Sequence, residues 1–178
     1  PHGPYVFGGV CMGGLVAWEM ARRLTRRGRP VAHLVIIDTW AAGSRLLMTS
    51  GQQRRWLARH VVRTVRWRTY LATLALLRRP LPPHRIPALR RFIHNANAAA
   101  VMRYRPGRCA VPTTFVLARD ARIAVTPDPR LEFASLADGP TEILASPGDH
   151  ESVCHGDNVP TLAATLRRVL DGAEGAHP

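Results

Sequence analysis

The sequence predicts an α/β fold in which a parallel sheet of four strands is interrupted by a long helical insertion. Four short runs rich in β-branched residues are typical of buried parallel strands, and they lie near residues 5–9, 31–37, 113–118 and 141–145. A helix-like run at residues 15–21 separates the first two, as the crossover between parallel strands requires. Helical patterns occur between the second and third of these runs, within residues 57–77.

The first strand ends in a glycine-rich turn that is typical of a catalytic nucleophile. Gly9, Cys11 and Gly13 form G-x-C-x-G between a strand and a helix. A nucleophile on such a strained turn needs almost no side chain two positions before and after it, so we expect both glycines to be required. The helix amides favour a thiolate, and the N–H of Met12 would donate to an oxyanion. The alternative is an inert buried cysteine, but the flanking strand and helix favour catalysis.

The second strand, at residues 31–37, ends in an acid. Asp38 lies at the carboxyl end of this strand, where α/β sheets place catalytic groups, and one strand–helix–strand unit after Cys11. An aspartate there also fits a cap of the next segment, and position alone leaves both interpretations open. Asp120 follows the third strand and is a competing acid.

The insertion carries an amphipathic pattern. Leu57, Val61 and Val65 recur every four residues, which predicts a helix with one apolar face. Residues 70–77 form a second apolar stretch, and Pro80 begins the prolines that stop it.

The last predicted strand leads into a loop that contains a histidine. His150 follows Pro147-Gly148-Asp149, and a closing helix is expected from about residue 160 to 170. The chain order of nucleophile, acid and histidine is that of the α/β-hydrolase arrangement. This loop position distinguishes His150 from the other seven histidines.

These motifs together match a known family. The segment GPYVFGGVCMGGLVAWEMARRL, followed by RPVAHLVIIDTW, resembles the thioesterase domains that end nonribosomal peptide synthetases and related polyketide synthases. In that family the nucleophile lies in G-x-[SC]-x-G-G, and the acid and histidine lie in motifs matched here by residues 37–40 and 148–150. The resemblance implies an α/β-hydrolase fold, with the C-terminal part of the parallel sheet and an inserted helical lid. The core would be residues 1–42 and 106–171, and the lid about 43–105.

The resemblance also implies an activity. Such domains release an acyl or peptidyl chain from a phosphopantetheinyl carrier protein, by hydrolysis or cyclisation, without a cofactor of their own. Cys11 would attack the thioester, His150 would take its proton, and Asp38 would orient His150. Most members use serine where this chain has Cys11. Members also have several strands before the nucleophile, so we expect that an N-terminal part of the same polypeptide is missing here.

Composition limits the cellular setting. No stretch of about eighteen apolar residues exists, so we expect no membrane span. Cys11, Cys109 and Cys154 form no C-x-x-C pair, which favours a reduced, cytoplasmic protein. Cys154 and His155 lie close to His150, but their spacing matches no standard zinc pattern, and we predict no metal.

The charge is concentrated in and around the insertion. The formal net charge is +13, every basic residue other than histidine is arginine, and no Asp or Glu lies between Asp38 and Asp120. That interval holds 16 arginines, at positions 45, 54, 55, 59, 63, 66, 68, 78, 79, 85, 90, 91, 103, 105, 108 and 119. The use of arginine in place of lysine could reflect a GC-rich genome. The clustering of arginines in a segment without Asp or Glu, however, favours an anionic partner. We expect an acidic carrier protein to dock at Arg54, Arg55 and Arg59, with a membrane surface as the second choice and no nucleic-acid motif.

Three other functions remain open from the sequence. A free-standing editing thioesterase would share Cys11, Asp38 and His150 but act on misprimed carriers. A cysteine hydrolase of small lactones would share the turn but would not need a long basic lid. A carrier- or membrane-binding module without catalysis is the third.

Overall fold

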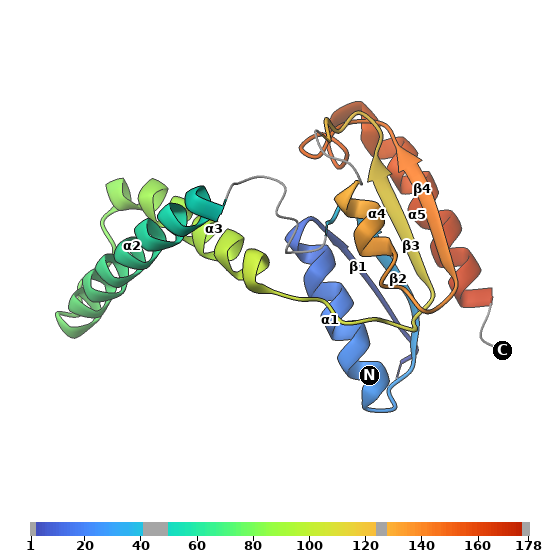
Figure 1. Cartoon of the computed structure of the whole chain (residues 1–178), viewed down its shortest axis with the longest axis horizontal. Coiled ribbons are helices and arrows are strands. Elements are labelled where there is room, and N and C mark those ends of the chain that lie inside the picture. The colour runs from blue at the N-terminus through green and yellow to red at the C-terminus, as the bar shows by residue number, and fades with distance from the viewer. Residues whose placement is uncertain (1–2, 41–49, 124–127, 176–178) are drawn as a thin grey trace. The chain divides into compact units, whose positions relative to one another are not determined.

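The computed structural model describes residues 3–40, 50–123 and 128–175. The chain forms two compact units, which we call the sheet unit (Pro1–Ala41 and Arg105–Pro178) and the helical unit (Ala42–Tyr104) (Figure 1). The boundary predicted near residue 42 lies outside the described residues.

The sheet unit is built on four parallel strands in the spatial order β1-β2-β3-β4. They are β1 (Tyr5–Val10), β2 (Val31–Ile37), β3 (Thr113–Ala118) and β4 (Thr141–Ser146). The predicted α/β class with a parallel sheet is confirmed, and only β1 and β4 extend one residue beyond the predicted ends. Because all four strands run the same way, their carboxyl ends meet at one edge of the sheet, where the sequence placed Cys11, Asp38 and His150.

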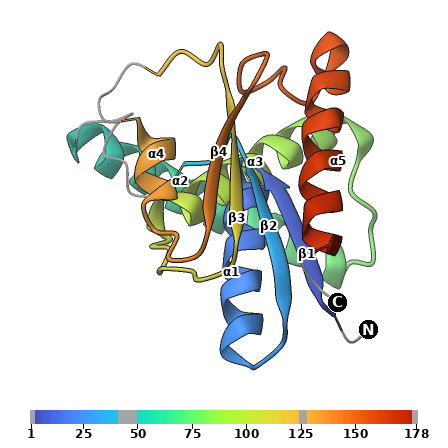
Figure 2. The ribbon, with the colours of Figure 1, turned by 90° about the vertical axis from the view of Figure 1, so that its right-hand side faces the viewer.

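Helices cover both faces of this sheet (Figure 2). One face carries α1 (Met12–Arg26) and the short α4 (Pro129–Ala134), and the other carries α5 (Val159–Gly175). Successive residues of a strand point to opposite faces, so a strand covered on both sides is apolar throughout. Residues 34–37 of β2 are all buried for this reason.

Aromatic side chains fix α1 and α4 against the sheet. The rings of Trp18 in α1 and Phe133 in α4 lie 4.9 Å apart, and both contact Phe115 of β3. All three side chains are fully buried. Burial of such a ring stabilises the folded state by roughly 1.5–3 kcal/mol, so this cluster holds α4 close to the end of β3.

On the opposite face, α5 completes a second core. Leu162 and Val169 of α5 pack with Val35 and Val116 of the sheet and with Val153 from the loop after β4. The helix starts one residue before the predicted position and extends five residues beyond it, to Gly175. The loop that carries His150 is therefore anchored to the core only three residues beyond that histidine.

The helical unit contains α2 (Ser50–Leu76), a short 3₁₀ turn (Pro83–Arg85) and α3 (Ile86–Arg103). The two apolar stretches that the sequence suggested are one continuous helix, because no proline separates them. The ring of Trp67 lies 5.8 Å from that of Phe92, which joins α2 to α3.

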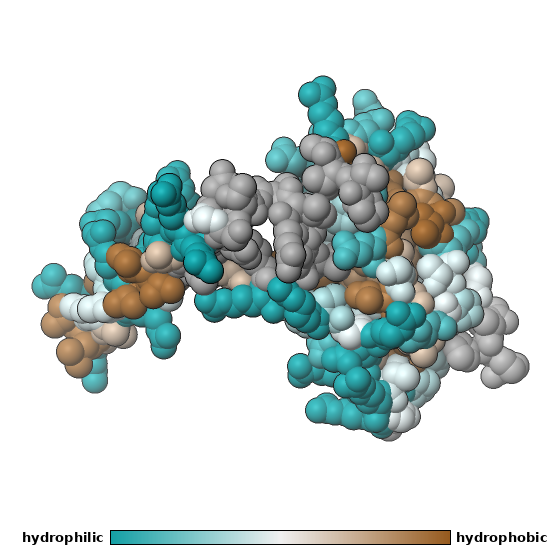
Figure 3. Space-filling view, in the orientation of Figure 1, coloured by the Kyte–Doolittle hydropathy of each residue, from teal (hydrophilic) through white to brown (hydrophobic). Residues whose placement is uncertain are grey.

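Two of the three residues of the predicted apolar face of α2 are exposed. Val61 and Val65 are 49% and 58% exposed, and the side chain of Leu57 lies outside the described residues. Trp67, which contacts Phe92, also packs edge-on against Tyr70. Hydrophobic and hydrophilic side chains consequently lie side by side on the surface of this unit (Figure 3). Among the described residues, no helix combines the length and apolar character needed to cross a bilayer.

Candidate active site

Cys11 occupies a strained turn between β1 and α1. Its φ is 53° and its ψ is −124°, a conformation that residues with a side chain rarely adopt. The Cys11 N–H donates to Ile37 O at 3.1 Å, and its carbonyl accepts from Gly14 N–H at 3.0 Å. Cys11 is also the N-cap residue of α1. The turn therefore presents a thiol at the positive end of a helix.

Two glycines make this turn possible, but they are not both the ones predicted. A Cβ at Gly9 would collide with the backbone of Gly13, which confirms that position. A Cβ at Gly13 would meet nothing within 4 Å, so the prediction that this glycine is sterically required is wrong. The second crowded position is Gly14, where a Cβ would overlap the Thr39 side chain. The reason is that Gly13 faces away from the sheet while Gly14 packs against the residue that follows Asp38.

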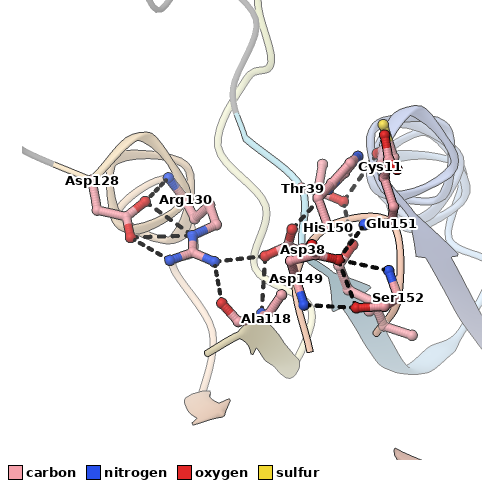
Figure 4. Close-up of polar contacts among 11 residues, drawn as sticks. Cys11, Asp38, Thr39, Ala118, Asp128, Arg130, Asp149, His150, Glu151 and Ser152 are labelled. Carbon is pink, nitrogen blue, oxygen red and sulfur yellow. Dashed lines mark hydrogen bonds and ion pairs between the residues drawn. The ribbon is translucent and has the colours of Figure 1, made fainter. Parts of the chain in front are cut away.

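Asp38 and His150 form a hydrogen-bonded pair (Figure 4). His150 Nδ1 lies 2.7 Å from Asp38 Oδ2, and because an ionised carboxylate only accepts, Nδ1 donates and Nε2 is left free. The Asp38 side chain is fully buried, whereas that of His150 is 33% exposed. Asp120, the competing acid, instead accepts from the Gly148 N–H at 2.8 Å.

The loop after β4 holds His150 in place. Gly148 has a φ of 97°, and a Cβ there would crowd the side chains of Asn158 and Ser152. Asp149 then closes a tight turn by accepting from the Ser152 N–H and hydroxyl at 2.9 and 2.6 Å, and these bonds lower the pKa of Asp149. The backbone around His150 is thus set by local hydrogen bonds that involve its own neighbours.

Two side chains that follow β2 support the same site. The ring of Trp40 lies 4.7 Å from that of His150, centroid to centroid. The Thr39 hydroxyl lies within hydrogen-bond distance of the carbonyl oxygens of Cys11 and Ile37, at 3.0 and 2.9 Å. Residues 38–40 therefore supply the carboxylate that binds His150, a hydroxyl that contacts the backbone of the Cys11 turn, and a ring that packs against His150.

Arg130 is a site residue that the sequence analysis missed. Its Nη1 donates to Asp38 Oδ1 at 2.7 Å and to the Ala118 carbonyl at 2.9 Å, and its side chain is 8% exposed. Asp128 holds the other side of the guanidinium and also caps α4, accepting from the Arg130 N–H at 2.9 Å. Asp128-Pro129 is a typical helix start. The Asp128-Pro129 pair could have predicted the start of α4, but no sequence feature distinguishes Arg130 from the other 24 arginines.

Between described residues, the Cys11 thiol makes no hydrogen bond with the His150 ring. Catalytic hydrogen bonds are often long in the absence of substrate and tighten when it binds. The structure thus brings Asp38 and His150 together, and it places Cys11 at the end of the neighbouring strand in a conformation suited to a nucleophile.

The other two thiols have unfavourable surroundings for nucleophilic attack. Burial raises the pKa of Cys109. The pKa of Cys154 is raised first by burial and second by the negative charge of Asp38. Since the thiolate is the reactive form, both residues are poor nucleophiles near neutral pH.

The remaining predicted residues lie at separate places. Met12 is the first residue of α1, where backbone N–H groups have no partner within the helix. Arg54, Arg55 and Arg59 are exposed on α2 in the helical unit, which contains no Asp or Glu. In the described part of the chain, no three His, Cys, Asp or Glu side chains gather as a metal ion would need.

Comparisons with known proteins agree with this arrangement. Enterobactin synthase component F of Escherichia coli (strain K12) is 50% identical over 40 residues, which are 22% of this chain and 3% of that protein. The crystal structure of the NocB thioesterase domain from the nocardicin cluster matches with a TM-score of 0.60 at 23% identity, over 96% of this chain and 66% of that one. The thioesterase domain SrfTE, which cyclises the lipopeptide antibiotic surfactin, matches with a TM-score of 0.63 at 17% identity, over 96% and 69%. At these identities the two structures show a shared fold.

The chain spans 2% or 3% of the length of the first curated relatives. The thioesterase domain family model, by contrast, matches residues 1–170, almost the whole chain. The four parallel strands, the turn at Cys11 and the Asp38–His150 pair therefore belong to a member of the thioesterase domain family, with the α/β-hydrolase fold.

Proposed function

We propose that this thioesterase domain releases an acyl or peptidyl chain from the phosphopantetheine arm of a carrier protein, with Cys11 as its nucleophile. The observation that carries the proposal is the combination of the strained turn at Cys11 with the Asp38–His150 pair at the neighbouring strand end. Family membership supports the thioester substrate, and relatives such as enterobactin synthase component F support a setting in a larger synthetase.

The first half of the reaction transfers the acyl group to the enzyme. His150 Nε2 takes the proton from Cys11 Sγ, and the thiolate attacks the carbonyl carbon of the thioester. The Met12 N–H stabilises the oxyanion that forms. When the intermediate collapses, the bond to the pantetheine sulfur breaks, and His150 returns the proton to that leaving thiol. Asp38 holds the imidazole in one tautomer and stabilises its cation.

The second half removes the acyl group from Cys11. Water, or an amine or hydroxyl of the acyl chain itself, attacks the new thioester while His150 Nε2 takes its proton. Collapse then expels the Cys11 thiolate, which recovers the proton from His150. Water gives hydrolysis and an internal nucleophile gives cyclisation. Because the intermediate on Cys11 is a thioester, it is more reactive toward a weak internal nucleophile than an oxygen ester, which makes cyclisation chemically reasonable.

We propose that the carrier protein is acidic and docks on the arginines of α2. Arg54, Arg55 and Arg59 are exposed, and the helical unit offers them no carboxylate. A guanidinium suits both the carboxylates of an acidic carrier and the phosphate of its pantetheine arm.

Substitution of each cysteine in the full-length protein tests the nucleophile. Cys11→Ala should lower release from an acyl-pantetheine thioester by several orders of magnitude, because the covalent step is lost. Cys109→Ala and Cys154→Ala are matched controls that should keep most of the activity. Near-normal turnover by Cys11→Ala would refute the assignment.

A further inference from the structure

We propose that Arg130 is a positioning residue of the active site, which pairs with the buried carboxylate of Asp38 and keeps it turned toward His150. The inference rests on the proposed function, since it assigns a task within the Asp38–His150 pair. No sequence motif indicates this role, because Arg130 lies 92 positions from Asp38 and in no recognised motif.

The contacts of Asp38 divide its two oxygens between two tasks (Figure 4). Oδ1 accepts from the Ala118 N–H at 2.9 Å and from Arg130 Nη1 at 2.7 Å. Oδ2 accepts from His150 Nδ1 at 2.7 Å. The carboxylate group rotates about the Cβ–Cγ bond alone. The two hydrogen bonds to Oδ1 therefore also fix the direction of Oδ2.

Burial makes the charge on Arg130 necessary. The Asp38 side chain has no exposure to solvent, and an ionised carboxylate is strongly destabilised there unless charges and hydrogen bonds compensate it. Among the described residues, Arg130 forms the ion pair with Asp38 that is present whatever the protonation state of His150. It therefore compensates the buried carboxylate with a positive charge also when the His150 ring is neutral, between proton transfers.

Arg130 is itself held rigidly. Nε and Nη2 bind the two oxygens of Asp128 at 2.7–3.1 Å, and Nη1 also donates to the Ala118 carbonyl. Burial opposes the charge of Arg130, but the hydrogen bonds that Arg130 donates to Asp128 and Asp38 outweigh it, and the pKa of Arg130 is raised. In the same pair, the hydrogen bond from Arg130 lowers the pKa of Asp128. The planar fork of an arginine is needed to bind two carboxylates on two of its edges.

The structural basis is the first turn of α4. Asp128 caps the helix, Pro129 is its first residue, and Arg130 follows, so one short turn fixes Arg130 and the carboxylate of Asp128 that binds its guanidinium. The aromatic contact between Phe133 and Trp18 secures this turn against the sheet. The placement of Arg130 thus depends on packing on the α1 face rather than on the loop of His150.

Substitution of Arg130 in the full-length protein tests the proposal. The variants are Arg130→Met, which removes the positive charge, and Arg130→Lys, which keeps the charge but lacks the planar guanidinium that can bind two carboxylates. Arg108→Met is the matched control, because Arg108 also pairs with an aspartate but lies on the surface, at 60% exposure. The readouts are kcat and KM for a short acyl-pantetheine thioester, the low-field proton resonance of His150 Nδ1–H, and thermal unfolding.

We expect Arg130→Met to lose the low-field resonance and to lower kcat roughly tenfold to a hundredfold, part of the 10²–10⁴ that acid–base catalysis contributes, with KM little changed. Arg130→Lys should restore the resonance and bring kcat to within about tenfold of the wild type. A merely structural arginine would lower the unfolding temperature and leave the resonance and kcat of the folded variant unchanged. That result, or equal behaviour of the Lys and Met variants, would overturn the proposal.

Two further arms keep the test decisive. If Arg130→Met does not fold, Asp128→Ala can be tested instead. This variant removes the carboxylate that binds the Arg130 guanidinium but does not change the Asp38 or Arg130 side chain itself. It should then weaken the resonance and lower kcat several-fold, and wild-type values for both would contradict the proposal. The resonance does not depend on any substrate. If the wild type shows no thioester turnover, the proposed function fails, while the resonance still decides the role of Arg130.

Discussion

Asp38 shows how much of this site depends on a single side chain. It pairs with His150 through one oxygen and with Arg130 through the other, and its backbone has a positive φ of 40°. Its N–H donates to the Val116 carbonyl at 2.8 Å, which fixes the residue at the end of β2. The carboxylate is therefore set by both main-chain and side-chain contacts.

Asp38→Asn should lower kcat by about 10³–10⁴-fold, because an amide favours the wrong histidine tautomer and cannot stabilise the imidazolium. The measurement is steady-state turnover of a short acyl-pantetheine thioester. Asp120→Asn is the control. Its amide oxygen can still accept from the Gly148 N–H, so we expect activity close to wild type. A larger loss in Asp120→Asn than in Asp38→Asn would contradict the account.

The turn at Cys11 makes a prediction about two adjacent glycines. Gly14→Ala should destabilise the fold by about 1–3 kcal/mol, because its Cβ would displace the buried Thr39 side chain. Gly13→Ala should be neutral or stabilising by up to about 1 kcal/mol, because its Cβ meets open space and alanine favours a helix. Urea unfolding of both variants measures the difference. Equal destabilisation would show that the turn is packed differently.

At the level of elements, the sheet was the most predictable part. A strand buried on both faces is mostly apolar, and β2 and β3 have this pattern apart from His33 and the two threonines that begin β3, so their bounds matched the prediction. Because Cys11 follows β1 and Asp38 follows β2, the prediction of parallel strands also placed these two residues at the same edge of the sheet. The position of His150 in the glycine-containing loop after β4 predicted the third residue of the site.

Other elements were not predictable for physical reasons. α4 is only six residues long, too short for a periodic pattern, and its stability comes from Phe133 packing on Trp18. The length of α2 was missed because its sequence changes character near Thr69 without a residue that ends a helix. Arg130 was missed because its importance arises from tertiary contacts with Asp38.

At the scale of the whole molecule, the charge is uneven. The net charge is +13, yet the helical unit has no acidic residue at all. In the sheet unit, by contrast, arginines such as Arg22, Arg108 and Arg168 form ion pairs with carboxylates. The arginines of the helical unit have no carboxylate within their own unit, and we propose that the carrier protein docks there.

Replacing Arg54, Arg55 and Arg59 together with Gln should weaken release from a carrier-bound substrate and reduce its sensitivity to salt, because surface ion pairs are screened by ions. A short synthetic thioester should be turned over as by the wild type. The measurement is kcat/KM for both substrates at low and high ionic strength. Equal losses on both would assign these arginines a structural or active-site role instead.

The central claim is that the acyl chain is carried on the thiol of Cys11. Its most direct test is to quench the full-length protein during turnover of an acyl-pantetheine thioester and to map the acylated residue by mass spectrometry of its peptides. We expect an acyl group on the peptide that contains Cys11, which is absent after Cys11→Ala and unaffected by Cys154→Ala. An acyl group on Cys109 or Cys154, or turnover by Cys11→Ala at the wild-type rate, would contradict it.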